Sequence, residues 1–244
     1  CNYCRHQLAL GKSLRCSVNA VAGLERGLDA ITPAKVPRKV LVVGGGASGV
    51  QIAEELHESG REVYFSIGRY RRTPRRYRGR DIYWWFGTLQ IFDRPEVKDE
   101  RFPLVTGVAG GRDIDLRRLR ADGVKMLGRL RGISAGRIFL ADDLEQHLTE
   151  GEAWFASFRK RMDEYADANG LDLPEEPAEK SAPEEWGSPS PILELETKAA
   201  GISAVIWATG FRYDFDWIKL PVFDDSSEPL QRRGVSPCPG FYFL

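Results

Sequence analysis

The sequence has few cysteines and no long apolar run. Cys1, Cys4, Cys16 and Cys238 do not make a disulfide framework in a chain of 244 residues. Cys1-x-x-Cys4 lies near His6 and Cys16 but has no second Cys-x-x-Cys pair, so we expect no metal site. No stretch approaches the roughly 18 apolar residues of a membrane helix, and no signal peptide opens the chain. We expect reduced thiols, a cytoplasmic location and no membrane partner.

An excess of either charge is also absent. Lys plus Arg and Asp plus Glu each number 35, so the net charge neither favours nor opposes a polyanionic partner. The apolar fraction of 42% is ordinary for a protein that buries a core. The chain begins with Cys rather than Met, and it stops in an apolar run, 241–244, that predicts a strand. Both ends lead us to expect a fragment of a longer protein.

A glycine-rich loop lies between a predicted strand and a predicted helix. Residues 39–43 are a short apolar run, typical of a buried parallel strand. After the loop, Val50, Ala53 and Leu56 recur with helical spacing, Gly60 suits a left-handed cap, and 62–65 predict a second strand. This order of elements predicts an α/β fold of the Rossmann type.

The loop fits the dinucleotide-binding fingerprint Gly44-x-Gly46-x-x-Gly49. The first glycine permits a tight turn, the second lets the backbone approach a pyrophosphate, and the third lets the helix pack on the sheet. The N-terminus of the helix offers free N–H groups to an anion. We therefore predict that Gly44, Gly46, Ala47, Ser48 and Gly49 bind a dinucleotide.

The residues after the second strand indicate which dinucleotide. Sites for NAD or FAD usually place an acid there, where it bonds the ribose 2′-hydroxyl. Here the stretch 66–72 reads Ser-Ile-Gly-Arg-Tyr-Arg-Arg and contains no acid. Hydroxyl and guanidinium groups suit the 2′-phosphate of NADPH. We predict that Ser66, Arg69 and Arg71 bind that phosphate.

Residues 61–80 carry eight arginines and no lysine, and we expect only one or two of these arginines to bind phosphate. A basic stretch is usually a solvated surface, and it could also contact nucleic acid. We expect Arg75, Arg76, Arg78 and Arg80 to serve solvation, ion pairs or packing over Trp84 and Trp85.

The rest of the chain predicts further elements and one crossing between domains. Residues 113–140 are typical of short strands and turns, 142–168 of a helix, and 173–191 of a linker or surface loop. A buried strand over 202–208 leads directly into Thr209-Gly210. This pair could be a simple strand-end turn, or a crossing close to the cofactors where Gly210 permits close approach of the backbone.

These features together resemble the flavin-containing monooxygenase family. The likeness lies in VLVVGGGASGVQIAEEL (40–56), SIGRYRRTPRRYRGRDIYWW (66–85), VIWATGFRYDFDWI (205–218) and RRGVSPCPGFYFL (232–244). The first is similar to the NADPH-binding unit of the family, and the third to the stretch that joins its two cofactor domains. The family's earlier glycine motif, which binds FAD, is missing from this chain.

The resemblance implies a doubly wound Rossmann unit within a flavoprotein of two dinucleotide-binding domains, with inserted helical and loop segments. Residues 1–37 would be a remnant of the FAD domain, 38–208 the NADPH domain, and 209–244 the return segment. NADPH would reduce FAD, which would then activate O2 to oxygenate a small organic substrate. Thr209 and Gly210 would lie near both cofactors. No catalytic residue is assigned, and none of His6, His57 and His147 is expected to be one.

Three alternatives remain. A relative of the pyridine-nucleotide–disulfide reductases would need a redox Cys-x-x-Cys near the flavin, and Cys1-x-x-Cys4 lies outside any plausible βαβ context. A non-catalytic module could bind NADPH without flavin turnover. A nucleic-acid-binding protein could use the arginine stretch, and its affinity would fall linearly with the logarithm of salt concentration. We expect no nucleic-acid partner.

Overall fold

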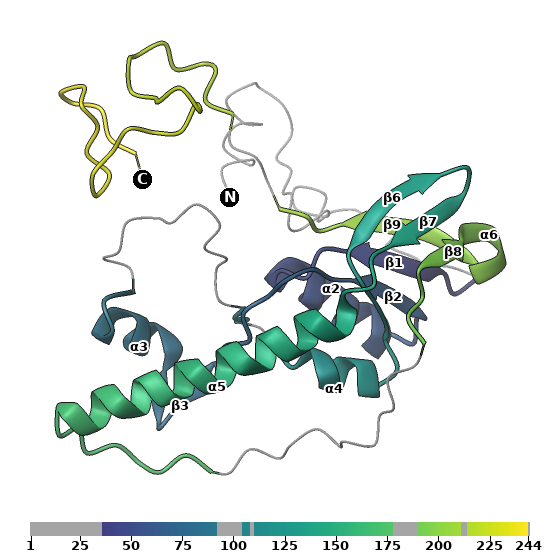
Figure 1. The fold of residues 1–244 in the computed structure, drawn as a ribbon, viewed down its shortest axis with the longest axis horizontal. Helices are drawn as coiled ribbons and strands as arrows, with labels where there is room; N and C mark the ends of the chain where they lie inside the picture. The colour runs from purple at the N-terminus through teal and green to yellow at the C-terminus, as the bar shows by residue number, and fades with distance from the viewer. Residues whose placement is uncertain (1–35, 92–103, 108–109, 178–189, 211–213, 244) are drawn as a thin grey trace, which may run out of the picture.

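The centre of the fold is a four-stranded parallel sheet in the order β5-β2-β1-β9 (Figure 1). The computed structural model describes residues 36–91, 104–107, 110–177, 190–210 and 214–243. The strands are β1 (Lys39–Val43), β2 (Val63–Ser66), β5 (Lys125–Leu127) and β9 (Ile202–Trp207). In chain order these are the first, second, third and fourth parallel strands, and their arrangement 3-2-1-4 is that of a Rossmann fold. The predicted fold class is confirmed.

The inner strands β1 and β2 are buried on both faces of the sheet, which explains their continuous apolar sequences. On one face, Val40 and Val42 pack with the buried side of α2 (Ala47–Glu58) and with α4 (Leu116–Ala121). On the other face, Leu41 and Val43 pack with β7 (Arg137–Leu140). That second cover is an antiparallel sheet of β6 (Leu130–Ser134), β7 and β8 (Glu194–Glu196), because the connection from β5 to β9 folds back over the parallel strands.

The strongest local patterns form the expected elements. The strand predicted at 39–43 is β1, and the predicted helix face of Val50 and Ala53 is fully buried in α2. Gly60 follows the helix with φ +78, as a left-handed cap requires. The helix predicted over 142–168 is α5 (Leu144–Ala168). The strands predicted at 62–65 and 202–208 lie within one residue of β2 and β9. The prediction that the second of these is buried is wrong, because β9 is an edge strand with Trp207 57% exposed.

One short helix and one missing strand differ from the sequence analysis, and a second short helix lies where no element was predicted. α4 lies in a region predicted as strands and turns, because Asp115 caps it by accepting the N–H groups of Arg117 and Arg118. Asp81 likewise caps α3 (Ile82–Thr88) through the N–H of Tyr83. The strand predicted at 241–244 is wrong over 241–243, where only an isolated bridge joins Tyr242 to Val235. Residues 241–243 have no neighbouring strand among the described residues, so this single bridge does not continue into a ladder of hydrogen bonds.

A second core lies where α5 packs on the segment 77–89. Trp85, Phe86, Phe158 and Met162 are all buried there, and Trp85 donates from Nε1 to the Tyr77 carbonyl at 2.9 Å. The short strands β3 (Arg76–Tyr77) and β4 (Arg80–Asp81) lead into α3 beside this core. The long helix α5 thus packs at one end on the Rossmann unit and along the rest of its length on the segment 77–89 (Figure 1). Residues 173–177 and 190–191 of the predicted linker carry no regular structure, and 178–189 lie outside the described residues.

The C-terminal segment 214–243 forms a small aromatic cluster. Phe215, Phe223 and Phe243 lie with ring centroids 5.4 to 6.1 Å apart. A bridge between Phe223 and Pro229 closes a turn beside them. None of the described helices is both long and apolar enough to cross a membrane.

Glu62 joins three strands at the amino edge of the sheet. It lies just before β2, forms an ion pair with Lys39 of β1 at 2.8 Å, and accepts a hydrogen bond from Lys125 of β5. Hydrogen bonds from Lys125 and Lys39 lower the pKa of Glu62 to about 2. Because the folded pKa lies below the unfolded one, this stabilisation is present above about pH 4.3 and is lost as the pH falls toward 2.

Glu62→Gln is therefore expected to lower stability at neutral pH but not in acid. The loss should be below about 1 kcal/mol, since these side chains are partly exposed and water screens them. Urea unfolding at about pH 7 and at several lower values would measure it. A difference between the two proteins that grows as the pH falls would contradict the assignment.

Candidate functional site

The glycine loop packs against the end of β9, at the point where the strand order reverses. A Cβ built on Gly44 would lie 2.3 Å from the Ala208 carbonyl oxygen, and one on Gly49 would lie 1.8 Å from the Gly44 oxygen. Gly44 also has φ +118, which side chains rarely adopt. The loop therefore needs glycine at both positions. In open α/β sheets, ligands bind in the crevice beside such a reversal.

Gly46 is the open position of the loop. A Cβ built there meets nothing within 4 Å among the described residues, and the glycine itself is exposed. It is the N-cap of α2, where no side chain caps the helix and the first turn has no acidic residue. Ser48 is exposed and Ala47 is half-buried in that turn. The N–H groups of the first turn have no partner within the helix, and an anion can approach them from the open side of Gly46.

Ser66 connects β2 to β5. Its carbonyl accepts the Gly44 N–H at 2.9 Å, and its hydroxyl, which is buried, donates to the Gly128 carbonyl at 2.8 Å. The hydroxyl hydrogen is therefore already used in a hydrogen bond that links the ends of β2 and β5. Phosphate binding by Ser66 stays a prediction, in which only the lone pairs or a reoriented hydroxyl could take part.

Arg69 and Arg71 follow β2 on the way out of the sheet and differ in surroundings. Arg69 is exposed. Arg71 is half-buried, with its guanidinium 4.2 Å from the centre of the Trp154 ring of α5. A guanidinium held over a ring keeps its edge for hydrogen bonds. Both residues remain predicted phosphate ligands, and Arg69 is the one that follows β2 more closely.

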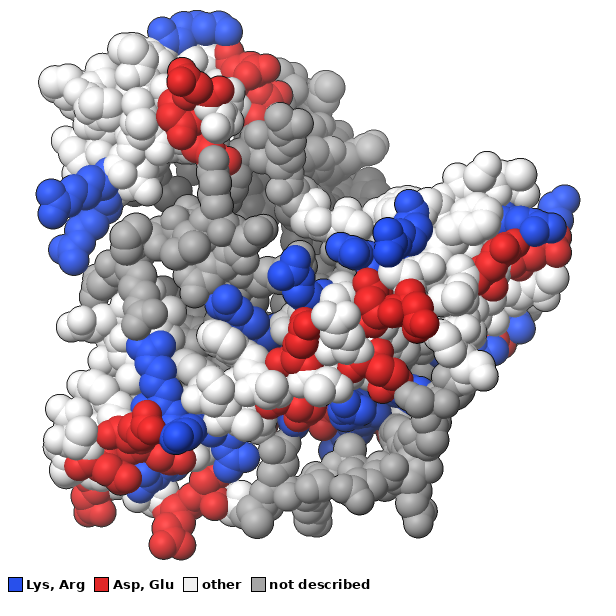
Figure 2. Space-filling view, in the orientation of Figure 1, with Lys and Arg blue, Asp and Glu red and all other residues white. Residues whose placement is uncertain are grey.

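The other arginines of this stretch fulfil structural roles, as expected. Arg75 forms an ion pair with Asp81, Arg78 one with Asp163 at 3.4 Å, and Arg80 lies 5.2 Å from the centre of the Trp84 ring. On the face shown in Figure 2, basic and acidic groups lie next to one another in several such pairs.

Arg72 has a role that the sequence does not indicate. It is buried, with 6% of its side chain exposed. It pairs with Glu152 at 2.6 Å and with Asp115 at 3.3 Å. Arg72 therefore joins the segment after β2 to the cap of α4 and to α5 rather than facing a ligand.

Thr209 and Gly210 follow β9 beside the glycine loop. The Thr209 nitrogen would lie 3.1 Å from a Cβ built on Gly44, so the two segments touch through their backbones. Gly210 has φ +88, and both residues are exposed. The structure thus brings Gly44, Gly49, Ser66 and Thr209 to one edge of the sheet. A role in cofactor binding for Thr209 and Gly210 stays a prediction.

One residue at the same edge carries no signal in the sequence. Arg129 follows β5, and its Cδ lies 3.8 Å from a Cβ built on Gly68. Only the pairing of β2 with β5 places Arg129 beside Gly68, so neither residue spacing nor a sequence motif could have identified it.

The histidines give no catalytic arrangement. His57 lies on α2 near Gly123, and His147 is buried on α5 with Nε2 3.2 Å from Asp143 Oδ2. Within the described part of the chain, no three His, Cys, Asp or Glu side chains gather as metal ligands would. His6 and the Cys1, Cys4 and Cys16 group lie outside the described residues.

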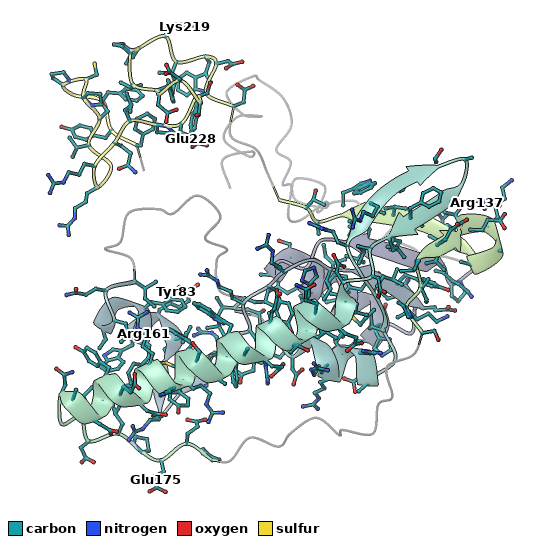
Figure 3. The ribbon with its side chains drawn as sticks, viewed as in Figure 1. Tyr83, Arg137, Arg161, Glu175, Lys219 and Glu228 are labelled. Carbon is teal, nitrogen blue, oxygen red and sulfur yellow. The ribbon has the colours of Figure 1, made fainter. Side chains whose placement is uncertain are left out.

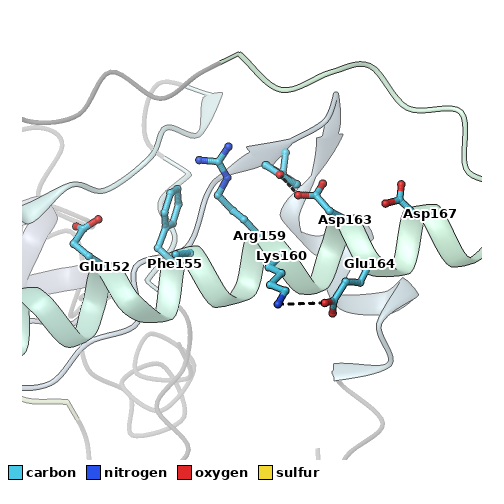
Figure 4. Close-up of a pocket in the computed structure, with 9 residues that line it drawn as sticks. Glu152, Phe155, Arg159, Lys160, Asp163, Glu164 and Asp167 are labelled. Atoms are coloured by element: carbon cyan, nitrogen blue, oxygen red, sulfur yellow. Dashed lines mark hydrogen bonds and ion pairs between the residues drawn. The ribbon is translucent and has the colours of Figure 1, made fainter.

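A shallow hollow of about 590 Å³ runs along α5. Figure 4 shows it between Glu152 and Asp167, with Phe155 and Arg159 on its wall. Its charges are largely matched, since Lys160 pairs with Glu164 at 3.7 Å and the Tyr77 hydroxyl donates to Asp163 at 2.8 Å. No predicted site residue lines it.

The chain is similar in sequence to proteins named as oxidoreductases. No protein-family model matches the chain, and no solved structure matches it significantly. The "Uncharacterized oxidoreductase CzcO-like" of Geobacillus kaustophilus (strain HTA426) is 29% identical over 208 residues, which cover 84% of this chain and 44% of that protein. The "Uncharacterized oxidoreductase CzcO" of Bacillus subtilis (strain 168) is 26% identical over 216 residues, with shares of 84% and 44%.

A shorter match has higher identity. The "NADH oxidase" of Thermoanaerobacter brockii is 48% identical over 50 residues, which cover 20% of this chain and 8% of that protein. The chain spans less than half the length of the CzcO proteins it matches. By sequence, this Rossmann-like chain is similar to proteins named as oxidoreductases.

Proposed function

We propose that the glycine loop binds NADPH. The observation that carries the proposal is the open side of Gly46, at the uncapped N-terminus of α2 and at the reversal of strand order. A pyrophosphate fits such a place because the backbone is accessible and the helix end is electropositive. The end of β2 supports the choice of coenzyme, since Arg69 and Arg71 follow it and 66–72 contain no carboxylate for a ribose 2′-hydroxyl.

We further propose that the whole protein is an FAD- and NADPH-dependent oxidoreductase of the monooxygenase type. The relatives named as oxidoreductases and as an NADH oxidase support redox chemistry, and the resemblance to flavin-containing monooxygenases supports the finer assignment. When bound, NADPH supplies a hydride and FAD passes electrons to O2 for oxygenation of a small organic substrate. The residues of this chain would bind and orient the nicotinamide coenzyme.

The same proposal assigns the parts of the chain. Residues 38–208 form the NADPH-binding unit, while 1–37 and 209–244 belong with the FAD-binding side. Gly44 and Gly49 fix the loop, and Thr209 and Gly210 carry the chain from β9 toward the other cofactor. The alternative is a module that binds NADPH without flavin turnover. Adding FAD to the whole protein, rather than to this chain, separates the two, because a bound flavin spectrum that NADPH bleaches would support the oxidoreductase and exclude the non-catalytic module.

Calorimetry with NADPH and NADH tests the coenzyme. We expect the chain to bind NADPH about tenfold or more tightly than NADH, since charge-assisted hydrogen bonds to the 2′-phosphate have no counterpart in NADH. Arg69→Ala should remove most of that preference without weakening NADH binding. Arg80→Ala is the matched control, because that arginine packs over Trp84.

Equal affinity for the two coenzymes would refute the preference for NADPH, and tighter binding of NADH would favour the coenzyme in the name of the NADH oxidase relative. Absence of binding to either would refute the dinucleotide site itself. Binding of DNA whose affinity falls linearly with the logarithm of salt concentration would instead support the arginine stretch as a nucleic-acid contact.

A further inference from the structure

The segments that follow β2 and β5 run side by side out of the sheet. Ser66 pairs with Leu127, and the Ile67 N–H donates to the Leu127 carbonyl at 3.1 Å. The Ser66 hydroxyl then bonds the Gly128 carbonyl at 2.8 Å, which extends the contact one residue beyond β5. After Gly128 comes Arg129, whose Cδ lies 3.8 Å from a Cβ built on Gly68. Arg129 therefore lies against the backbone of the residue that precedes Arg69.

The backbone of Arg129 is held firmly. Its N–H donates to Asp143 Oδ1 at 2.8 Å. At the preceding position a Cβ would lie 2.0 Å from the Ala141 carbonyl oxygen, so Gly128 permits the close approach of the segment 141–143. These contacts fix where the Arg129 side chain leaves the main chain.

The guanidinium of Arg129, by contrast, is held loosely. Its Nε lies 3.6 Å from Asp143 Oδ2, which is longer than a hydrogen bond, and 57% of the side chain is exposed. The same carboxylate oxygen lies 3.2 Å from Nε2 of His147, so Asp143 is shared between two basic groups. An exposed pair of this kind contributes little to stability. The guanidinium can turn toward a stronger anion at small cost.

We propose that Arg129 is a second binding residue for the 2′-phosphate and helps to select NADPH over NADH. The inference rests on the proposed dinucleotide site. A phosphate monoester carries close to two negative charges and several acceptor oxygens, so guanidinium groups from two adjacent segments can bind it together. A 2′-hydroxyl has no such charge, and Arg129 gains nothing from it. Arg69 and Arg129 thus form a clamp across the ends of β2 and β5.

The experiment compares Arg129→Ala with wild-type protein and with Arg137→Ala. Arg137 begins β7 at the far end of the β6–β7 hairpin (Figure 3), where it pairs with Glu194. The probes are NADPH, NADH, adenosine 2′,5′-bisphosphate and AMP, each titrated by calorimetry. Arg129→Ala should weaken the two 2′-phosphorylated probes about tenfold and leave NADH and AMP within about twofold. Arg137→Ala should change none of them, and Arg129→Lys should recover part of the loss.

Different outcomes refute different claims. An Arg129→Ala variant with unchanged NADPH affinity, while Arg69→Ala loses it, would overturn the clamp and leave the dinucleotide site intact. An equal loss for NADPH and NADH would also overturn it, because the residue would then act on the loop in general. Wild-type protein that binds none of the probes would refute the proposed function, and the clamp with it. Thermal unfolding of each variant shows whether its fold is preserved, as expected for an exposed side chain.

Discussion

Gly49→Ala is expected to destabilise the Rossmann unit by about 3 kcal/mol or more, because the new methyl has no space. Its Cβ would lie 1.8 Å from the Gly44 carbonyl oxygen and 3.3 Å from Ala208 Cβ. The first of these is a backbone atom of the turn after β1, so relief requires moving α2 or the strand itself. Alanine favours a helix interior over glycine by only about 1 kcal/mol, which is smaller than the clash. Thermal and urea unfolding measure the loss.

Gly46→Ala is the matched control in the same loop, and it should separate folding from binding. The position has φ −76 and ψ 174, which alanine adopts readily, and a Cβ there meets nothing within 4 Å. Stability should therefore change by less than about 1 kcal/mol. NADPH affinity should nevertheless fall at least about tenfold, since the methyl occupies the side from which a pyrophosphate approaches. Unchanged affinity would place the pyrophosphate elsewhere, and a stable Gly49→Ala would contradict the close packing of the loop.

Arg72→Ala is expected to cost about 3 kcal/mol, because it leaves two carboxylates without their shared cation. Arg72 bonds Glu152 of α5 at 2.6 Å and Asp115 at 3.3 Å, and its guanidinium lies 4.1 Å from the centre of the Phe155 ring. Asp115 also caps α4, so its orientation matters to that helix. One arginine therefore connects the segment after β2, the cap of α4 and the middle of α5.

Two companion variants divide this effect into packing and charge. Arg72→Met keeps much of the contact with Phe155, so the difference between Met and Ala measures packing. Arg117→Ala is the control, since Arg117 is more exposed and lies 4.0 Å from Glu145, a pair worth less than about 1 kcal/mol. A free energy of unfolding for Arg72→Ala equal to that of Arg117→Ala would contradict the buried role. If the folded Arg72→Ala variant still binds NADPH, the role of Arg72 is structural, in contrast to the phosphate-binding role proposed for Arg69.

Residue patterns predicted the structure correctly where neighbouring residues alone decide the local conformation. The strand 39–43, the glycine loop, the buried face of Val50 and Ala53, and the cap at Gly60 follow from residue spacing and backbone preference alone. The sequence did not predict the short helix α4, because this helix depends on contacts outside its own segment. α4 has only the residues Leu116–Ala121, too few for a periodic pattern, and it depends on a cap by Asp115 that is itself anchored to Arg72.

The roles of the individual arginines show the same limit. Eight of them lie between residues 61 and 80, and composition cannot tell a buried pair from a phosphate ligand. Burial singled out Arg72, ring contacts placed Arg71 over Trp154 and Arg80 over Trp84, and ion pairs occupied Arg75 and Arg78. These contacts join residues up to 85 positions apart, so they exist only after folding.

The sequence by itself determined the Rossmann unit, the position of its glycine loop and the absence of an acid after β2, because these depend on neighbouring residues. The tertiary structure alone decided that Gly44 and Gly49 pack on the backbone of the loop and of the residue after β9 while Gly46 stays open, and that Arg129 lies beside Gly68. The physical reason is that parallel strands distant in the chain bring their carboxyl ends to one edge of the sheet. What surrounds each loop residue is therefore set by the order of the strands.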